Sequence, residues 1–296
     1  MKILISILLI FAALFSTASY AAIPFPQINP TAFTVFGFNV QWYGICYLIG
    51  LGGALLFNYL LLKRDHRTSK TYNAHISAGR FTDIAVNCFL GAIIGGRLGY
   101  VLFYDLQAYL ADPIQIFMIH KGGMSFHGGF LGVLATLWLQ TRKTKDFWTV
   151  ADLGATVIPF ALCVGRIGNF INGELWGRPT DVPWAMEFPS GGYIPRHPSQ
   201  LYEAALEGLV LFIILVSVRW KQIPRPGLLS GLFVMGYGIS RFIIEFFRNP
   251  DAQLGYVLGP FTQGQVLSTP MILFGLWLVL SSKHRKVNPV TPQFEN

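Results

Sequence analysis

The residues best suited to chemistry in this chain lie in one stretch, Gly165 to Gly177, which reads Gly-Arg-Ile-Gly-Asn-Phe-Ile-Asn-Gly-Glu-Leu-Trp-Gly. A largely apolar run from Val150 to Val164, long enough to enter a membrane, leads directly into Arg166, two asparagines and Glu174. Charged and polar side chains at membrane depth are costly and usually functional. The glycines remove side-chain bulk, so the backbone can approach a ligand or a neighbouring helix. This stretch is therefore the first candidate for a site.

A simpler interpretation of the same stretch stands beside this one. An arginine at a helix end can snorkel to the lipid headgroups, and glycines in membrane helices often only pack. Snorkelling explains Arg166 but explains neither the two asparagines nor Glu174. The combination of residues favours a site.

A second stretch rich in glycine, Gly122 to Gly129, surrounds His127. A hydrolase elbow would need a glycine two residues after Ser125, but His127 stands there, so that motif fails. A lone histidine is as often structural as reactive. Because glycines flank it on both sides, we expect His127 to be exposed and reachable.

A third group of polar residues interrupts an apolar segment near the C-terminus. Tyr237, Arg241, Glu245 and Arg248 are spaced so that all four fall on one face of a helix. A polar stripe in an apolar helix faces a cavity or a partner. We expect Arg248 to lie nearer the water than Arg241.

Two further motifs are accounted for by structural roles. Glycines between residues 91 and 99 are spaced for close helix packing, and Arg97 among them needs a carboxylate or a phosphate as partner. At the start of another apolar segment, Ser199 or one of its neighbours can cap the helix, and Glu203 falls in the first turn, where a carboxylate is favoured.

The composition indicates what kind of scaffold must position these groups. Of the 296 residues, 53% are hydrophobic and only 12% are charged, and the mean hydropathy is +0.49. These values exclude a soluble globular protein and predict an all-α, polytopic membrane protein. The three cysteines form no C-x-x-C pair, and neither a nucleotide fingerprint nor a zinc spacing occurs, so we expect no metal and no cofactor.

Seven apolar segments follow one another and predict seven core transmembrane helices. They span approximately residues 41–62, 82–104, 126–140, 150–168, 200–218, 228–247 and 264–281.

The distribution of positive charge predicts how these helices are oriented. The net charge is +8, but lysines and arginines gather in every second connection between segments, which argues against a nucleic-acid partner. By the positive-inside rule those connections and the C-terminus are cytoplasmic, whereas the loops near 105–125, 169–199 and 248–263 lie outside. The polar site is therefore expected on the outer side.

The chain divides into three parts. Residues 1–22 have a basic start, an apolar run and a small-residue end, which is the layout of a secretory signal cleaved after Ala21; an uncleaved extra helix is the alternative. Residues 23–286 form one seven-helix transmembrane domain, whose prolines make residues 23–40 a non-helical outer arm. Residues 287–296 are a C-terminal tail.

Together these motifs resemble the signatures of the bacterial prolipoprotein diacylglyceryl transferases. The stretch Gly165 to Gly177 is similar to the signature of that family, and Gly122 to Gly129 is similar to its histidine motif. Further similar stretches are residues 42–44, 95–100, 196–203 and 236–248. The resemblance covers roughly residues 35–285, and residues 1–22 depart from the family pattern.

The resemblance implies a transferase of the bacterial inner membrane that works on the periplasmic side. Its substrates would be phosphatidylglycerol and preprolipoproteins whose signal peptides carry a lipobox cysteine. The diacylglyceryl group would pass to the cysteine thiol as a thioether, and glycerol phosphate would leave.

The chemistry of that reaction assigns roles to the residues that match the motifs. A thiol with a pKa of about 8.5 is mostly protonated near neutrality, so a base such as His127 would raise the thiolate fraction. Arg166 and Arg241 suit the phosphate, because a guanidinium stays charged and offers a forked set of donors. These three are the expected catalytic residues. The expected lipid-binding residues are Arg166, Arg241, Tyr43, Asn169, Glu174, Gly177, Tyr237 and Glu245.

Two other classes of protein remain open from the residues. An anion or phosphate transporter or channel would also carry pore arginines, but it would show polar stripes on several helices and no reactive base. The chain has no internal repeat, which weakens an inverted-repeat transporter. An intramembrane serine protease built on Ser125 lacks the elbow motif.

Cysteine labelling checks the predicted orientation. A cysteine placed at Ser190 should react with an impermeant thiol reagent added to the outer face of the membrane, whereas a cysteine at Ser69 should react only after the membrane is opened. The parent protein, with its three native cysteines, gives the background. The opposite labelling pattern would overturn the orientation.

Overall fold

The structure is a computed structural model that describes residues 22–68, 75–103, 106–118, 122–221, 223, 225–250 and 256–285. The predicted signal-like segment, apart from Ala22, and the predicted C-terminal tail lie outside the described residues.

Each of the seven apolar segments contains a helix within the described residues. Their bounds are Trp42–Thr68 (α2), Ala78–Phe103 (α3), Phe126–Thr141 (α5), Phe147–Ile171 (α6), Ser199–Trp220, Leu228–Ile244 (α9) and Gln263–Ser281 (α10). The fifth of these comprises α7 (Ser199–Glu203), a π-helix η4 (Ala204–Val210) and α8 (Leu211–Trp220).

Five of these helices are long and apolar enough to cross a membrane: α2, α3, α6, the stretch from α7 to α8, and α10. Helices α5 and α9 are shorter. The apolar pattern predicted an end near residue 247 for α9, but the helix ends at Ile244. A mostly helical chain with these spans fits a polytopic membrane protein.

Short elements fill the connections. They are α4 (Leu106–Ala111) and the single turns Pro113–Phe117 (η1), Pro189–Gly191 (η3) and Ser282–His284 (η5). The strands are β1 (Ile23–Pro24), β2 (Thr31–Val35), β3 (Phe38–Gln41), β4 (Met186–Glu187), β5 (Pro195–Arg196), β6 (Tyr256–Leu258) and β7 (Phe261–Thr262).

The strands form three small sheets. One has the order β1-β4-β5, in which β1 and β4 run parallel and β4 and β5 antiparallel; the others are antiparallel hairpins of β2 with β3 and of β6 with β7. The N-terminal arm is non-helical, as its prolines predicted. Phe36 and Gly37 both have positive φ, at 49° and 82°, which is the geometry of a tight hairpin turn.

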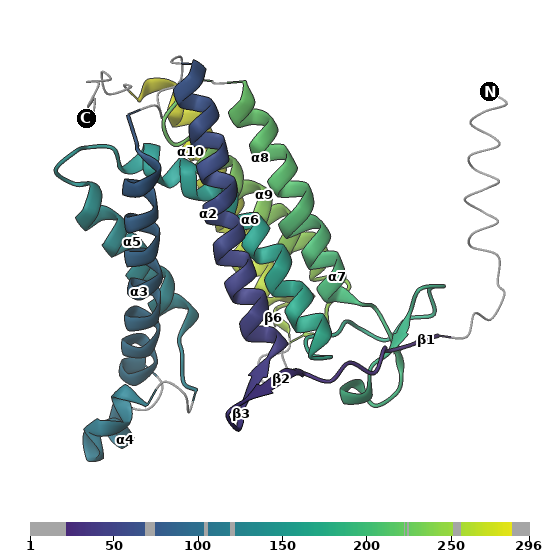
Figure 1. The fold of residues 1–296 in the computed structure, drawn as a ribbon. Helices are drawn as coiled ribbons and strands as arrows, with labels where there is room; N and C mark the ends of the chain where they lie inside the picture. Colours follow the sequence, from purple (N-terminus) through teal and green to yellow (C-terminus); the bar gives the residue numbers. More distant parts are fainter. Residues whose placement is uncertain are drawn as a thin grey trace, which may run out of the picture.

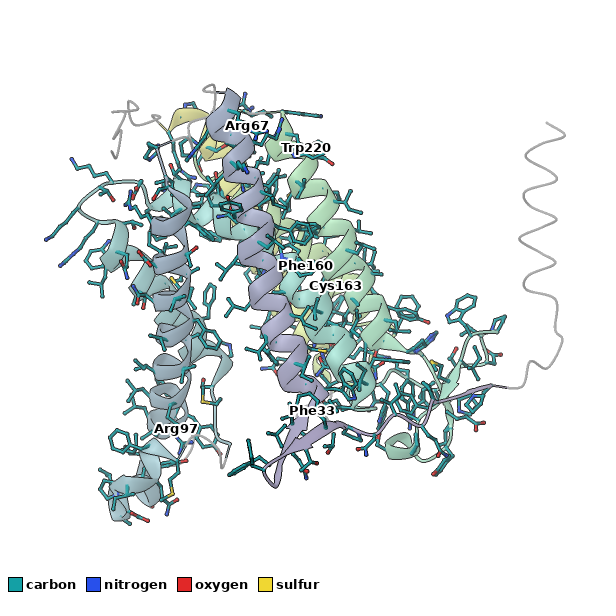
Figure 2. The ribbon with its side chains drawn as sticks, viewed as in Figure 1. Phe33, Arg67, Arg97, Phe160, Cys163 and Trp220 are labelled. Carbon is teal, nitrogen blue, oxygen red and sulfur yellow. The ribbon has the colours of Figure 1, made fainter. Side chains whose placement is uncertain are left out.

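The helices form one bundle with a helix pair beside it. Figure 1 shows α2, α6, α8, α9 and α10 side by side, with α3 and α5 next to them. In Figure 2, Arg67 at the end of α2 and Trp220 at the end of α8 mark one end of the bundle, and Phe33 in β2 marks the opposite end. A buried cluster that includes Leu62, Phe81 and Leu153 joins the pair to the bundle.

Helices α3 and α5 pack closely because glycines face each other across their contact. A methyl group on Gly95 would overlap the carbonyl oxygen of Gly128, and one on Gly132 would overlap that of Gly91. The backbones can approach this closely only without side chains between them. The predicted packing role of the 91–99 glycines is confirmed.

Within the described residues, main-chain carbonyl groups surround Arg97, where the sequence predicted a carboxylate or a phosphate. Its guanidinium is buried and donates hydrogen bonds to the carbonyl oxygens of Gln115, Ile116 (2.8 Å), Gly122 (2.6 Å) and Gly123 (3.0 Å). Main-chain oxygens can satisfy a buried guanidinium. Arg97 therefore holds the connection between α3 and α5.

Buried carboxylates fix the other helices. Asp152 on α6 accepts hydrogen bonds from the backbone nitrogen (2.8 Å) and the hydroxyl (2.6 Å) of Ser230, in the first turn of α9. Arg219 on α8 donates to Asp65 (2.9 Å) and to Asn58 (3.0 Å), both on α2. Breaking a buried pair leaves an uncompensated charge, so these contacts keep α6 with α9 and α2 with α8.

Gly132→Ala should destabilise the protein, because the added methyl group would meet the main chain of α3. Overpacking of this kind typically costs about 1–3 kcal/mol. Gly52→Ala is the matched control, since Gly52 is also helical and a methyl group there would meet nothing within 4 Å. Thermal unfolding in detergent should show a lower midpoint for Gly132→Ala only; equal midpoints would contradict the packing argument.

Candidate functional site

Six charged side chains meet inside the bundle. Three are arginines and three are glutamates, and they come from α6, from the helix that contains η4, and from α9 with the residues that follow it. They are Arg166, Arg241, Arg248, Glu203, Glu207 and Glu245. Their formal charges cancel, which is what a low-dielectric interior requires of buried ions.

Glu203 lies at the centre of this cluster. One carboxylate oxygen accepts hydrogen bonds from Arg241 Nη1 at 2.6 Å and Arg248 Nη1 at 3.3 Å, and the other lies 3.0 Å from Arg166 Nε. The Glu203 side chain is fully buried. One carboxylate therefore joins three arginines from different parts of the chain.

The predicted capping roles of Ser199 and Glu203 are wrong. The N-cap of α7 is Pro198, which makes no side-chain cap, and the Ser199 hydroxyl donates to the carbonyl oxygen of Leu175 at 2.9 Å. Glu203 faces the arginines instead of the helix N-terminus. Capping was inferred from local spacing, whereas buried cations elsewhere in the chain decided where this carboxylate points.

Glu245, which the sequence predicted as lipid-binding, holds Arg241 in the structure. Its carboxylate lies 2.5 Å from Arg241 Nη2 and accepts a hydrogen bond from the Thr262 hydroxyl at 2.7 Å. Thr262 caps α10. Glu245 thus ties the guanidinium of Arg241 to the start of the next helix.

Arg248 does not lie nearer the water than Arg241. The exposed fractions of the two side chains are 12% and 15%. Because α9 ends at Ile244, Arg248 reaches Glu203 from the turn after the helix rather than along a helical face. A backbone contact fixes that turn, since Arg178 Nε donates to the carbonyl oxygen of Arg248 at 2.8 Å.

Glu207 is the member of the cluster that sequence reasoning missed. Its fully buried carboxylate lies 3.4 Å from Arg166 Nη2 and 3.8 Å from Arg241 Nη1. The only signal in the sequence was its position four residues after Glu203 in an otherwise apolar segment, which places both carboxylates on similar sides of the helix.

The polar end of α6 folds back on itself. Asn169 Nδ2 donates to Glu174 Oε1 at 2.9 Å, and Asn172 Nδ2 approaches the same oxygen at 3.4 Å. The Gln200 side chain donates to the carbonyl oxygen of Glu174 at 2.6 Å, which attaches this loop to α7. The Glu174 carboxylate is exposed, so the loop presents an ordered polar surface beside the arginines.

Gly177 lies where three segments meet. Its nitrogen donates to the carbonyl oxygen of His197 at 2.8 Å, and a methyl group on it would come within 2.5 Å of the Phe247 carbonyl oxygen. Only glycine fits this closely.

Burial lowers the pKa of the His197 imidazole below its usual 6.5, and the nearby Asp181 carboxylate opposes this effect.

The two predicted tyrosines lie on α2 and α9. Tyr43 lies in the first turn of α2, packs beside Gly168 and shares a 2.9 Å hydrogen bond with the Tyr47 hydroxyl. Tyr237 lies one turn before Arg241 on α9 and interacts electrostatically with Arg166. Both tyrosine side chains are half-buried, so each packs against the helices and still has part of its surface exposed.

His127 lies in the first turn of α5 and is exposed, as predicted. The Ser125 hydroxyl caps this helix by accepting a hydrogen bond from the nitrogen of Gly128 at 3.2 Å. His127 comes from a different packing unit than the arginines, since α5 packs mainly on α3 whereas Arg166 and Arg241 lie on α6 and α9.

The arrangement is suited to binding an anion. The side chains of Arg166 and Arg241 are 19% and 15% exposed, so both guanidiniums are held by carboxylates yet partly accessible. Two converging guanidiniums can donate to the oxygens of one phosphate. Among the described residues, no group of three histidine, cysteine, aspartate or glutamate side chains is placed to hold a metal ion.

Fold and site thus define a helical membrane protein with paired guanidiniums beside a glycine-rich polar loop. The sequence profile of the family described as prolipoprotein diacylglyceryl transferase matches residues 30–281. The chain belongs to this family, which confirms the resemblance seen in its motifs.

Curated relatives carry the name phosphatidylglycerol–prolipoprotein diacylglyceryl transferase. One from Pseudomonas putida is 53% identical over 270 residues, which cover 89% of this chain and 97% of the relative. One from Pasteurella multocida is 50% identical over 260 residues, which cover 86% of this chain and 93% of the relative. The similarity therefore extends over nearly the whole length of both relatives.

Glu203→Gln should lower the thermal unfolding midpoint strongly, because it leaves three arginines short of one buried negative charge. Removing one partner of a buried ion pair typically costs about 3–5 kcal/mol. Glu174→Gln is the matched control, since its carboxylate is exposed and a surface interaction is worth at most about 1 kcal/mol. Equal midpoints for the two variants in detergent would show that Glu203 does not hold the cluster together.

Proposed function

We propose that this protein transfers the diacylglyceryl group of phosphatidylglycerol to the thiol of the lipobox cysteine of preprolipoproteins. Its membership of the family supports the reaction. The structural observation that carries the proposal is the convergence of Arg166 and Arg241 on shared carboxylates, where a phosphodiester with the same charge and the same kind of acceptor oxygens can bind.

In the proposed reaction, the thiolate sulfur attacks the glyceryl carbon that bears the phosphodiester oxygen. A carbon–sulfur bond forms and the carbon–oxygen bond breaks, and glycerol phosphate leaves with the bonding electron pair. Negative charge moves from the sulfur to the departing phosphate, which Arg166 and Arg241 stabilise. Groups that are already oriented towards developing charge give the largest catalytic effects.

His127 takes the thiol proton in this proposal. A neutral imidazole is a suitable base near neutral pH, and an exposed position at the start of α5 lets a peptide substrate approach it. The remaining residues position the lipid. Asn169 and Glu174 keep the polar loop folded, and Glu245 orients Arg241.

Three other residues complete the proposed lipid site. Tyr43 and Tyr237 line it from α2 and α9, with Tyr43 packed beside Gly168 and Tyr237 one turn before Arg241. Gly177 lets the polar loop lie against the segments around His197 and Phe247, and so keeps the loop beside the arginines. The reaction needs no cofactor in this scheme, because both substrates bring the groups that react.

The protein is proposed to cross the bacterial inner membrane seven times, as one domain from residue 23 to 286, with its C-terminus in the cytoplasm and its active site towards the periplasm. The shared position of Arg67 and Trp220 at one end supports this orientation, because basic connections follow both residues (Figure 2). Both substrates would then be met at the outer leaflet.

A transporter or channel is the weaker alternative. The curated relatives carry a transferase name, and the charged side chains converge on one buried cluster rather than in stripes along several helices. A buried neutral cluster suits a binding site better than a conduction path.

The direct test incubates the purified protein with phosphatidylglycerol and a lipobox peptide, and then measures the mass of the peptide. The expected product is heavier by one diacylglyceryl group and no longer has a free thiol. A peptide with serine in place of cysteine and a lipid without the glycerol phosphate headgroup are the controls. An unmodified peptide under conditions in which the protein remains folded would count against the proposal.

Arg166→Lys should abolish most of the transfer, although the charge is retained, because lysine lacks the planar fork that contacts Glu203 and Glu207. Loss of one preorganised donor typically lowers kcat by about 10²–10³-fold. Arg64→Lys is the matched control, since Arg64 contacts Trp220 at the opposite end of the bundle. Full activity in Arg166→Lys would reduce Arg166 to a snorkelling anchor.

His127→Asn should lower the rate at neutral pH by about 10²–10⁴-fold, because asparagine keeps a hydrogen-bonding group but cannot take the proton. The rate of this variant should then recover as the pH approaches the thiol pKa of about 8.5, where thiolate forms unaided. Rates of peptide modification measured from pH 6 to about pH 9 test both points. A rate near that of the parent protein at neutral pH would exclude His127 as the base.

A further inference from the structure

Glu207 differs from the other two glutamates of the cluster in how weakly it is held. Glu203 has contacts of 2.6, 3.0 and 3.3 Å with three arginines, and Glu245 has contacts of 2.5 and 2.7 Å with Arg241 and Thr262. The shortest contact of Glu207 is 3.4 Å, and its Oε1 atom makes no hydrogen bond with any described residue. Yet the side chain is fully buried.

Arg166 and Arg241 are both held in place by glutamates other than Glu207. Arg166 is fixed through Nε by Glu203, and Arg241 is fixed through Nη1 and Nη2 by Glu203 and Glu245. The donor that Arg166 presents to Glu207, Nη2, has one hydrogen bond within the described residues, the 3.4 Å contact with Glu207 Oε2. Removing Glu207 from this place would therefore leave both guanidiniums in position.

Charge balance shows why Glu207 and a lipid phosphodiester compete. The three arginines and three glutamates already sum to zero, so a phosphodiester adds one negative charge to a buried cluster. An uncompensated buried charge is strongly unfavourable. The cluster becomes neutral again if Glu207, the most weakly held carboxylate, moves away from the two arginines and takes up a proton.

We propose that Glu207 is an internal anion that occupies the phosphate position on Arg166 and Arg241 until phosphatidylglycerol replaces it. On displacement the Glu207 carboxylate takes one proton from the solvent and becomes a neutral carboxylic acid. This inference rests on the proposed function, because it requires the lipid phosphate to bind these two arginines.

The local backbone limits the motion to the Glu207 side chain. The π-helix η4 that carries Glu207 is held against α6, since a methyl group on Gly208 would lie 2.5 Å from the Cβ atom of Cys163, labelled in Figure 2. The exchange therefore changes a rotamer and leaves the helix in place. Irregular helical turns of this type are frequent at functional sites.

Among the described residues, four charged or titratable groups face Glu207. They are Arg166 from α6, Arg241 and Tyr237 from α9, and Glu203 from the preceding turn. Both arginines stay charged, and Glu203 is held by these two and by Arg248. Glu207 is thus the group that can take up the proton.

The test measures the binding of dioctanoyl phosphatidylglycerol to the full-length protein in detergent by calorimetry between about pH 5.5 and pH 8.5. For the parent protein, affinity should fall by up to about tenfold per pH unit as pH rises, because one proton is taken up with each lipid. Repeating the titration in buffers of different ionisation enthalpy counts that proton directly. Glu207→Gln should bind the lipid more tightly and without this pH dependence.

Two further variants identify the group that takes up the proton. His127→Asn should keep the proton uptake, which excludes His127 as that group, and Glu207→Asp should keep it with altered affinity. If Glu207→Gln does not fold, the titrations of Glu207→Asp and of the parent protein still show whether a proton is taken up when the lipid binds. Lipid binding without proton uptake by the parent protein would overturn the inference alone, whereas binding that is unchanged in Arg166→Lys would overturn the proposed phosphate site itself.

Discussion

The structure depends on the carboxylate of Glu203, which contacts three arginines in the interior of a helix bundle. A single guanidinium at that depth would be costly, and a carboxylate there would be costly too. Each becomes tolerable only when the other is in place. The helices that carry Arg166, Glu203 and Arg241 must therefore pack together, and the same requirement that stabilises the bundle assembles the site.

Neutrality does not make the cluster inert. Arg166 and Arg241 remain partly exposed, and Glu207 holds them only loosely. The polar loop at the end of α6 is tied to α7 through Gln200, which keeps it beside the arginines. In the proposed anion-binding site the two guanidiniums are already oriented before the lipid arrives, so only the Glu207 side chain has to move when the phosphate binds.

The proposed base and the proposed phosphate clamp belong to two packing units. His127 is carried by α5, which glycines hold tightly against α3, whereas the arginines belong to the bundle of α6, α8, α9 and α10 (Figure 1). The distance between base and phosphate therefore depends on how the helix pair sits against the bundle. Arg97 supports this division, because its hydrogen bonds stay within the connection between α3 and α5.

The amino-acid sequence by itself determined the class of the protein. Apolar runs and basic connections predict helices that cross a membrane, because hydrophobicity and charge act locally along the chain. The motifs around Arg166 and His127 indicated the family, and the glycines predicted the close contact of α3 with α5. Spacing alone also placed Arg241 and Glu245 on one side of a helix.

Only the tertiary structure decided which charges pair. Glu203 had a sufficient local role as a first-turn carboxylate, yet it contacts three arginines. Arg97 was predicted to face an anion, and the described residues around it supply main-chain oxygens. Glu207 gave no signal beyond its spacing from Glu203. These partners lie tens of residues away in the chain. Burial makes their pairing obligatory, but which groups meet is set by the packing of the helices.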